Sequence, residues 1–159
     1  MKFEEWESFY SRIINDFRQE GFDRSKDRES EKRLMSLLKC RSSKDRLREL
    51  FGGRKVLVVG NGPGMEKDFK QDFEGVIAAA DAASHRLANL GVKPDFVCTD
   101  LDGKPEFEAG LSNDIPVAVH VHGDNKDLLE QFVPSFNHSN ILPTTQAEPS
   151  YGGENFGGL

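Results

Sequence analysis

The sequence has few of the features that mark secreted, zinc-binding or membrane proteins. It contains two cysteines, Cys40 and Cys98, far apart and without a CxxC pair, so it indicates neither a disulfide framework nor a zinc knuckle. No apolar run approaches the roughly 18 residues that a membrane helix needs, and the start "MKFEEWESFY" lacks the apolar core of a secretory signal. We therefore expect a cytoplasmic protein with no membrane partner.

Basic charge is also in deficit. The formal net charge is -6, which argues against a nucleic-acid partner, because general nucleic-acid binders usually present a basic surface. Residues 1–52 carry 13 Lys and Arg against 11 Asp and Glu, whereas residues 53–159 carry 8 against 16. An acidic domain that handles phosphate groups would need divalent cations to offset the repulsion.

The first third of the chain has the pattern of helices. Apolar side chains recur at steps of three and four over residues 4–17, which predicts an amphipathic helix ending near Gly21. A second helical pattern covers much of residues 25–51, with a break expected near residue 42. Two glycines in "FGGRK" then end the helical pattern. We predict an N-terminal helical segment at 1–52 and an α/β domain at 53–159.

After residue 52, short apolar runs alternate with helical stretches. The runs are "KVLVVG", "GVIAAAD", "KPDFVCTD", "IPVAVHVHGD" and "NILPTTQ". Apolar strands separated by helical stretches of roughly 10 residues predict βαβ units. The predicted fold class is α/β, a largely parallel, Rossmann-like sheet with helices on both faces. The tail "AEPSYGGENFGGL" lacks periodicity and is typical of a flexible active-site loop.

Two aspartates follow the third run, in "TDLDG". Asp100 and Asp102 would project to one side, since residues i and i+2 of a strand share a face. Two close carboxylates repel unless a cation lies between them, and Mg²⁺ prefers such oxygen ligands. The alternative is a turn, where Asp and Gly are favoured for backbone reasons. The apolar strand before the motif and the acidic loop after the next run favour the metal site.

The fourth run ends in "VHVHGDN". His120 and His122 would share a face and could bind zinc, but no nearby Cys or third His completes such a set. We expect one histidine to pack and hydrogen-bond while Asp124 turns toward the metal edge. His122 could instead meet a phosphate as a cation or hydrogen-bond donor.

Polar loops also follow the remaining runs, and in a parallel sheet all of them would gather at the carboxyl ends of the strands. "GNGPG" could present backbone N–H groups to a phosphate, or form only a tight strand-to-helix turn. The third glycine of the dinucleotide pattern would fall at Met65, which argues against NAD. Asp81 could cap a helix at 82–90, or bind a ribose or a base edge. Gln146 follows the fifth run at the same edge.

Several motifs together resemble the archaeal 6-hydroxymethyl-7,8-dihydropterin pyrophosphokinases over residues 55–158. They are "VVGNGPG", "ADAASHRLANLGVKPDFVCTDLDG", "HVHGDN", and "TTQ" ahead of "NFGG", in that order. The resemblance implies a fold related to the thiamin pyrophosphokinase catalytic domain. It also implies transfer of diphosphate from ATP to a reduced pterin, with release of AMP, on the way to folate or methanopterin-type cofactors.

The resemblance further implies roles for residues. Asp100, Asp102 and Asp124 would be catalytic and would hold Mg²⁺ against the ATP phosphates. The candidate nucleotide- and substrate-binding residues on the same edge are Gly60, Asn61, Gly62, Asp81, His122, Asn125 and Gln146. ATP and the pterin are the expected small-molecule partners.

The family pattern continues after N-x-GG into a "TDGDR"-like motif and further strands, whereas this chain stops at Leu159. We therefore expect an incomplete catalytic domain that need not be active in this form. Two alternatives to the pterin enzyme are a thiamin pyrophosphokinase and a non-catalytic nucleotide-binding module. The helical stripes of residues 1–52 need a partner surface, either the sheet domain or a second copy in a homodimer.

Overall fold

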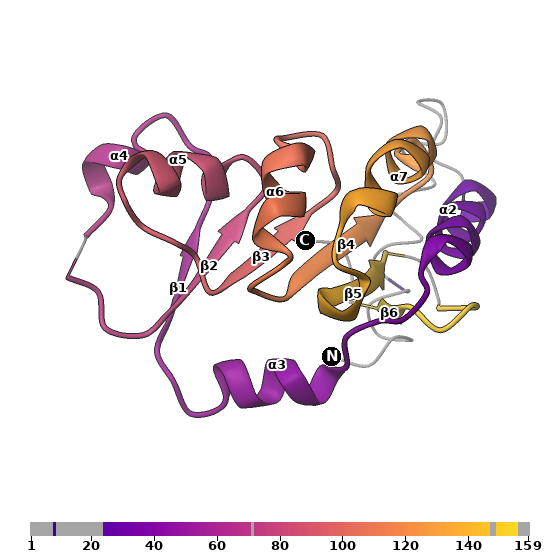
Figure 1. Cartoon of the computed structure of the whole chain (residues 1–159), viewed down its shortest axis with the longest axis horizontal. Helices are drawn as coiled ribbons and strands as arrows, with labels where there is room; N and C mark the ends of the chain where they lie inside the picture. Colours follow the sequence, from indigo (N-terminus) through magenta and orange to yellow (C-terminus); the bar gives the residue numbers. More distant parts are fainter. Residues whose placement is uncertain (1–7, 9–23, 71, 147–148, 156–159) are drawn as a thin grey trace.

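A computed structural model describes residue 8 and residues 24–70, 72–146 and 149–155 (Figure 1). The helices are α2 (Arg24–Leu37), α3 (Lys44–Phe51), α4 (Met65–Asp68), α5 (Ala83–Asn89), α6 (Pro105–Leu111) and α7 (Lys126–Phe132), followed by the 3-10 turns η2 (Val133–Ser135) and η3 (His138–Asn140). The strands are β1 (Val56–Val59), β2 (Val76–Ala80), β3 (Phe96–Thr99), β4 (Val117–Val121), β5 (Ile141–Thr145) and β6 (Glu154–Asn155). The helix predicted over residues 4–17 lies, apart from Ser8, outside the described residues.

The strands form one parallel sheet whose order is the order of the chain, β1-β2-β3-β4-β5-β6. One of the helices α4 to α7 connects each pair of neighbouring strands from β1 to β5. Parallel neighbours need such a crossover because the chain must return to the same end of the sheet. The predicted α/β class and parallel sheet are therefore confirmed. The helical stretch predicted after the glycine loop is shorter than its pattern suggested, since α4 ends at Asp68.

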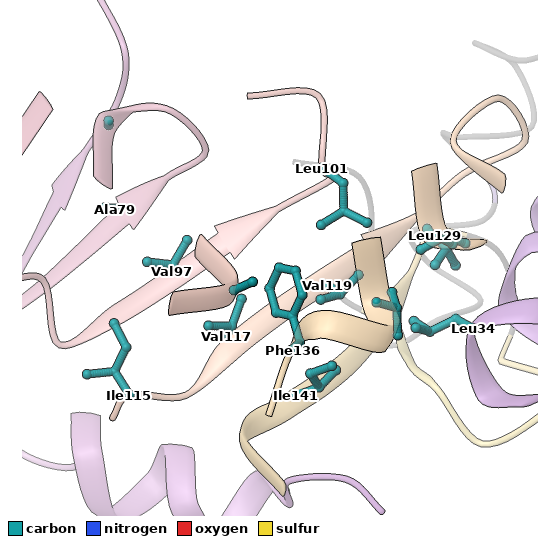
Figure 2. Packing of buried hydrophobic residues seen from close by; sticks show 14 of the residues in the cluster. Leu34, Ala79, Val97, Leu101, Ile115, Val117, Val119, Leu129, Phe136 and Ile141 are labelled. Carbon is teal, nitrogen blue, oxygen red and sulfur yellow. The ribbon is translucent and has the colours of Figure 1, made fainter. Parts of the chain in front are cut away.

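Side chains of the strands alternate between two faces, and one face carries the main core. Val59, Ala79, Val97, Val117, Val119, Val121 and Ile141 pack there with Met65, Leu87, Ala109 and Leu129 from the crossover helices. Figure 2 shows part of this cluster, with Val119 and Phe136 near its centre. Burial of these aliphatic side chains is the main favourable contribution to folding.

The second face is covered less evenly. Phe96 belongs to this face, and its ring lies edge-on to that of Phe51 in α3, with 5.3 Å between centroids. Helices thus lie on both faces, as expected. On the edge strand β1, Val56 and Val58 are 42% and 73% exposed.

Helix α2 packs at the β5 side of the sheet, beside α7 (Figure 1). Its Leu34 is completely buried in the same core as the strands. The residues between α2 and α3 are not helical, and among them Ser42 N donates to Ile141 O over 2.7 Å. The predicted break near residue 42 is confirmed, and the described part of the N-terminal segment packs on the sheet domain. Among the described helices, none combines the length and the apolar character needed to cross a bilayer.

Candidate functional site

The loops that follow the parallel strands meet at one edge of the sheet. Asp81 follows β2, Asp100 follows β3, His122 follows β4 and Gln146 follows β5. This edge is where open α/β sheets bind ligands, because loops from neighbouring strands converge there. The candidate site lies at the ends of β2, β3 and β4.

Three carboxylates form the centre of the site. Asp81, Asp100 and Asp102 each offer an oxygen, and these atoms all lie within 4.8 Å of one another. Backbone N–H groups link the three residues: Asp100 N donates to Asp81 Oδ1 over 3.1 Å, and Asp102 N donates to Asp100 Oδ1 over 3.2 Å. We call these three residues the acidic cluster. It is the group of acidic side chains in the described part of the chain that could hold a metal ion.

Unusual backbone conformations build the cluster. Asp81 and Leu101 have φ values of 46° and 74°, in the left-handed region that non-glycine residues rarely adopt. Leu101 is 1% exposed, so burial of its side chain helps to hold this turn. Thr99 Oγ1 accepts from Leu101 N over 2.9 Å and donates to Glu108 of α6 over 2.7 Å. The hydrogen bond between Thr99 and Glu108 thereby links the turn of Asp100 to Asp102 to α6.

Gly103 explains the glycine of "TDLDG". A Cβ at this position would lie 2.8 Å from Ala82 N and 3.3 Å from Asp81 Cβ. No real Cβ tolerates such a contact with backbone, so a side chain here would push the β3 loop away from the β2 loop. The glycine allows Asp102 and Asp81 to come together.

The three carboxyl groups ionise unequally. Burial and the charge of Asp100 raise the pKa of Asp81, whereas the hydrogen bond and the charge shared with Asp100 raise the pKa of Asp102. The pKa of Asp100 falls to about 2, mainly because His122 hydrogen-bonds to it. The negative charge of Asp100 contributes to both raised pKa values, and a bound cation would offset this contribution.

His122 lies between two aspartates. Its Nε2 is 3.3 Å from Asp100 Oδ2, and its Nδ1 hydrogen-bonds to Asp124 Oδ1. The hydrogen bond with Asp100 and, after it, the bond with Asp124 raise the pKa of His122 to about 9, in spite of partial burial. The imidazole is therefore a cation at neutral pH. His120 differs: burial lowers its pKa to about 4, and it hydrogen-bonds to Thr144 Oγ1 over 3.0 Å.

Asp124 is joined to the cluster through His122 rather than directly. Its side chain is 84% exposed. The role of Asp124 as a third metal ligand stays a prediction, and Asp81 is the third carboxylate that the structure places beside Asp100 and Asp102. The side chain of Asp81 does not cap α5, whose N-cap residue is Ala82. The capping interpretation of Asp81 is therefore wrong, because its carboxylate is turned toward Asp100 N instead.

Asn125 ties the β3 and β4 loops together. Its Nδ2 donates to Asp100 O over 3.0 Å and to His120 O over 2.9 Å, and its Oδ1 accepts from His122 N over 3.2 Å. The side chain is 2% exposed. Asn125 therefore shapes the site by holding backbone in place, with its polar atoms bonded to the protein itself.

The glycine loop after β1 forms the other side of the edge. Arg86 of α5 donates to Asn61 O, Asn61 Oδ1 and Gly62 O over 3.2, 2.9 and 2.8 Å, and pairs with Glu66 of α4. A cavity of about 560 Å³ opens beside β1, and Gly60, Gly62 and Gly64 contribute to its wall. Arg86 was not predicted from the sequence, since nothing in "SHRLAN" indicates that it reaches a loop more than twenty residues earlier.

Gln146 lies at the β5 end of the edge. Its Nε2 donates to Asp27 Oδ1 of α2 over 3.2 Å, and the side chain is half-buried. The predicted site residues are thus divided between the acidic cluster, the loop after β4 that carries His122, Asp124 and Asn125, and two flanking regions. Gly60, Asn61 and Gly62 lie on the β1 side, and Gln146 lies on the β5 side.

The parallel sheet and the acidic cluster at its carboxyl edge define an α/β protein with a candidate metal site, but not its family. Comparison with known proteins is more specific. Residues 31–158 match the family described as 6-hydroxymethylpterin diphosphokinase MptE-like. The chain belongs to this family, which confirms the resemblance that the sequence motifs indicate.

Curated relatives carry one name, 6-hydroxymethyl-7,8-dihydropterin pyrophosphokinase. The relative from Pyrococcus furiosus is 37% identical over 164 residues, covering 100% of this chain and 68% of the relative. Those from Methanothermobacter thermautotrophicus and Methanocaldococcus jannaschii are 34% and 33% identical. The chain covers 68% of the former and 64% of the latter, so it spans about two thirds of the length of these relatives.

Proposed function

We propose that this protein transfers the diphosphoryl group of ATP to the hydroxymethyl group of 6-hydroxymethyl-7,8-dihydropterin, releasing AMP. Membership of the family and the names of the archaeal relatives support this activity. The structural observation that carries it is the acidic cluster Asp81, Asp100 and Asp102 at the carboxyl edge of the sheet. We further propose a cytoplasmic place in folate or methanopterin-type biosynthesis.

The chemistry of the cluster fits Mg²⁺. Three carboxylates from two adjacent loops offer hard oxygen ligands, which Mg²⁺ prefers and usually combines with substrate phosphates. Burial is the main cause of the raised pKa of Asp81, and the hydrogen bond with Asp100 is the main cause of the raised pKa of Asp102. The negative charge of Asp100 adds to both increases, and a divalent cation would relieve that repulsion. We propose that these residues hold Mg²⁺, and that the ion, when bound, supplies positive charge for the phosphates of ATP.

The reaction itself asks mainly for alignment. The pterin hydroxyl oxygen bonds to the β-phosphorus, the bond from that phosphorus to the α-phosphate oxygen breaks, and the hydroxyl proton is released. Phosphoryl transfer of this kind depends on positioning and on neutralising charge. In this chain His122 offers a cation beside Asp100, and the Gly60 to Gly64 loop offers backbone at the β1 side.

The test is AMP formation by the protein at its native length, with Mg-ATP and either the pterin alcohol or thiamin. We expect the pterin alone to give AMP. Asp100→Asn and Asp102→Asn should each lower turnover by about a hundredfold or more, since each loses a carboxylate ligand for the Mg²⁺ whose positive charge would stabilise the transition state. Their melting temperatures should stay close to that of the wild type, because both groups lie at a strand end outside the core.

Asp45→Asn is the matched control. Asp45 is exposed on α3, where it pairs with Arg48. Its turnover should match that of the wild type. AMP from thiamin but not from the pterin would show that the protein is a thiamin pyrophosphokinase. Nucleotide binding without AMP formation from either acceptor would show a binding module.

A further inference from the structure

Helix α2 carries two buried acids on one face. Asp27 is 3% exposed and Glu31 is 1% exposed, and residues four apart lie on the same side of a helix. Burying a carboxylate is costly unless hydrogen bonds replace its water. Both residues accept hydrogen bonds from groups that lie more than a hundred positions later in the chain, in the segment after β5.

The carboxylate of Glu31 organises the loop of residues 150–153. Its Oε2 accepts from Ser150 N over 2.9 Å, and its Oε1 accepts from Tyr151 N over 3.1 Å and Gly153 N over 3.0 Å. Hydrogen bonds from N–H groups to a carboxylate are roughly twice as strong as those between neutral groups. A Cβ on Gly153 would come within 3.0 Å of Oε1, so the loop is folded closely around this one group.

Two further contacts hold the same loop. Arg41 donates through Nη1 to Gly152 O. Gly152 has a φ of 95°, which a side chain would rarely allow. Lys32 of α2 lies over the ring of Tyr151, with its Nζ 5.9 Å from the centroid. The described part of the predicted flexible loop is therefore attached to α2 and to the residues just after it.

Helix α2 also touches the loop that contains His122. A Cβ on Gly123 would lie 2.7 Å from Lys26 Cβ and 3.5 Å from Asp27 Oδ1. Asp27 in turn accepts from Gln146. One helix thus contacts the loops after β4 and β5, on the opposite side of the acidic cluster from the glycine loop.

We propose that Glu31 is a positioning residue for the transfer reaction. By fixing residues 150–153, it sets the wall of one substrate subsite on the β5 side, while the glycine loop bounds the other on the β1 side. This inference rests on the proposed diphosphate transfer, which has two substrates. Loss of Glu31 should therefore affect one substrate and spare the other.

The test compares Glu31→Gln with the wild type, using the protein at its native length. Glutamine keeps the volume but replaces one acceptor oxygen with an NH₂ group that faces N–H donors. Hydrogen exchange measures the amides of residues 150–153 directly, and we expect exchange about tenfold faster or more. The KM values for Mg-ATP and for the pterin are measured separately, and we expect one to rise severalfold, with kcat and the other KM changing by less than about twofold.

Matched variants keep the test decisive. Glu29→Gln on the same helix is the control, because Glu29 is exposed and lies 3.9 Å from Lys126. Gly153→Ala forces the loop and an intact Glu31 carboxylate apart by a few tenths of an ångström, and should give the same pattern if Glu31→Gln does not fold. Gly110→Ala is its control, since a Cβ there meets no atom within 4 Å outside its chain neighbours and the backbone of its own helix.

The outcomes separate this inference from the proposed function. Unchanged exchange at residues 150–153 in Glu31→Gln and Gly153→Ala would overturn the anchoring role. Faster exchange with both KM values unchanged, or with both raised equally, would overturn the positioning role. Absence of AMP formation in the wild type would overturn the proposed function, and therefore the catalytic role of Glu31, while the exchange measurement would still decide the anchoring.

Discussion

Glu108 should make the stability of the fold depend on pH. Burial raises the pKa of Glu108 from 4.5 to about 7. The hydrogen bond from Thr99 opposes this increase, and the negative charge of Asp81 adds to it. The residue is 0% exposed, and in the described structure its Oε1 has no hydrogen-bond partner. At roughly 1.4 kcal/mol per pKa unit, the difference between unfolded and folded chain corresponds to about 3 kcal/mol.

The direction follows from proton binding. Because the folded pKa is the higher one, the folded protein holds this proton between pH 4.5 and 7, whereas the unfolded chain has released it. Stability is therefore greatest below about pH 4.5 for this group and falls as the pH rises to about 7. From pH 5 to pH 8 the loss attributable to Glu108 should be about 2.5 kcal/mol.

Glu108→Gln isolates this contribution. Glutamine has nearly the same shape and can accept from Thr99, but it does not ionise. The wild type should lose about 2.5 kcal/mol of unfolding free energy between pH 5 and pH 8 that Glu108→Gln does not lose. The difference in unfolding free energy, variant minus wild type, should therefore increase by that amount. Urea denaturation at several pH values in the presence of a chelator measures it.

The comparison has a built-in control in the same helix. Glu106 is exposed in the first turn of α6, so Glu106→Gln should follow the wild type at every pH. If the curves of Glu108→Gln and the wild type stayed parallel from pH 5 to pH 8, Glu108 would be ionised in the folded protein. The burial account of its pKa would then be refuted.

Three further predictions concern the glycine of the β3 loop, the arginine of the β1 loop and the N-terminal helix. Gly103→Ala should separate the loops after β2 and β3. We expect urea denaturation to show a loss of about 1 to 3 kcal/mol in unfolding free energy, and calorimetry to show no Mg²⁺ binding. Normal Mg²⁺ binding would contradict the close approach of the two loops. Arg86→Lys should speed hydrogen exchange at the amides of Asn61, Gly62 and Gly64, because lysine lacks the planar fork of donors, and unchanged exchange would show that Arg86 does not hold this loop. Leu34→Ala should destabilise the whole domain by about 2 to 5 kcal/mol, and a value below about 0.5 kcal/mol would mean that α2 is not part of the cooperative unit.

The sheet was predictable because each strand is an apolar run of its own. The run "VAVHV" is buried between neighbouring strands, whereas "VLVV" forms the edge strand, but both are apolar enough for local composition to find them. The spacing of the runs required parallel crossovers. The position of Asp100 and Asp102 at a strand end followed directly. The length of α4 did not, because the stretch after Asp68 keeps helical spacing but leaves the helix at Phe69.

The rest of the site depends on contacts that spacing does not encode. Asp81 joins the cluster because its φ is 46° and its carboxylate accepts from the next loop, whereas its sequence context is that of a helix cap. His122 lies between Asp124 and Asp100, which no one-dimensional pattern reveals. Charged residues in α2 have the composition of a solvated face, yet Glu31 is buried by a loop 119 to 122 residues later. Side chains that act across such distances can be found only once the topology is known.

The order of the strands has a consequence for how the chain acquires its shape. Each strand pairs with the one before it in the sequence, so the sheet can grow one crossover at a time through contacts of modest sequence separation. The bond network of Glu31 is different, since it closes a loop of more than a hundred residues. We expect residues 150–153 to acquire their native geometry only after β5 has joined the sheet and α2 has packed against it. During synthesis, the loop of residues 150–153 would therefore reach its native geometry later than the strands from β1 to β5.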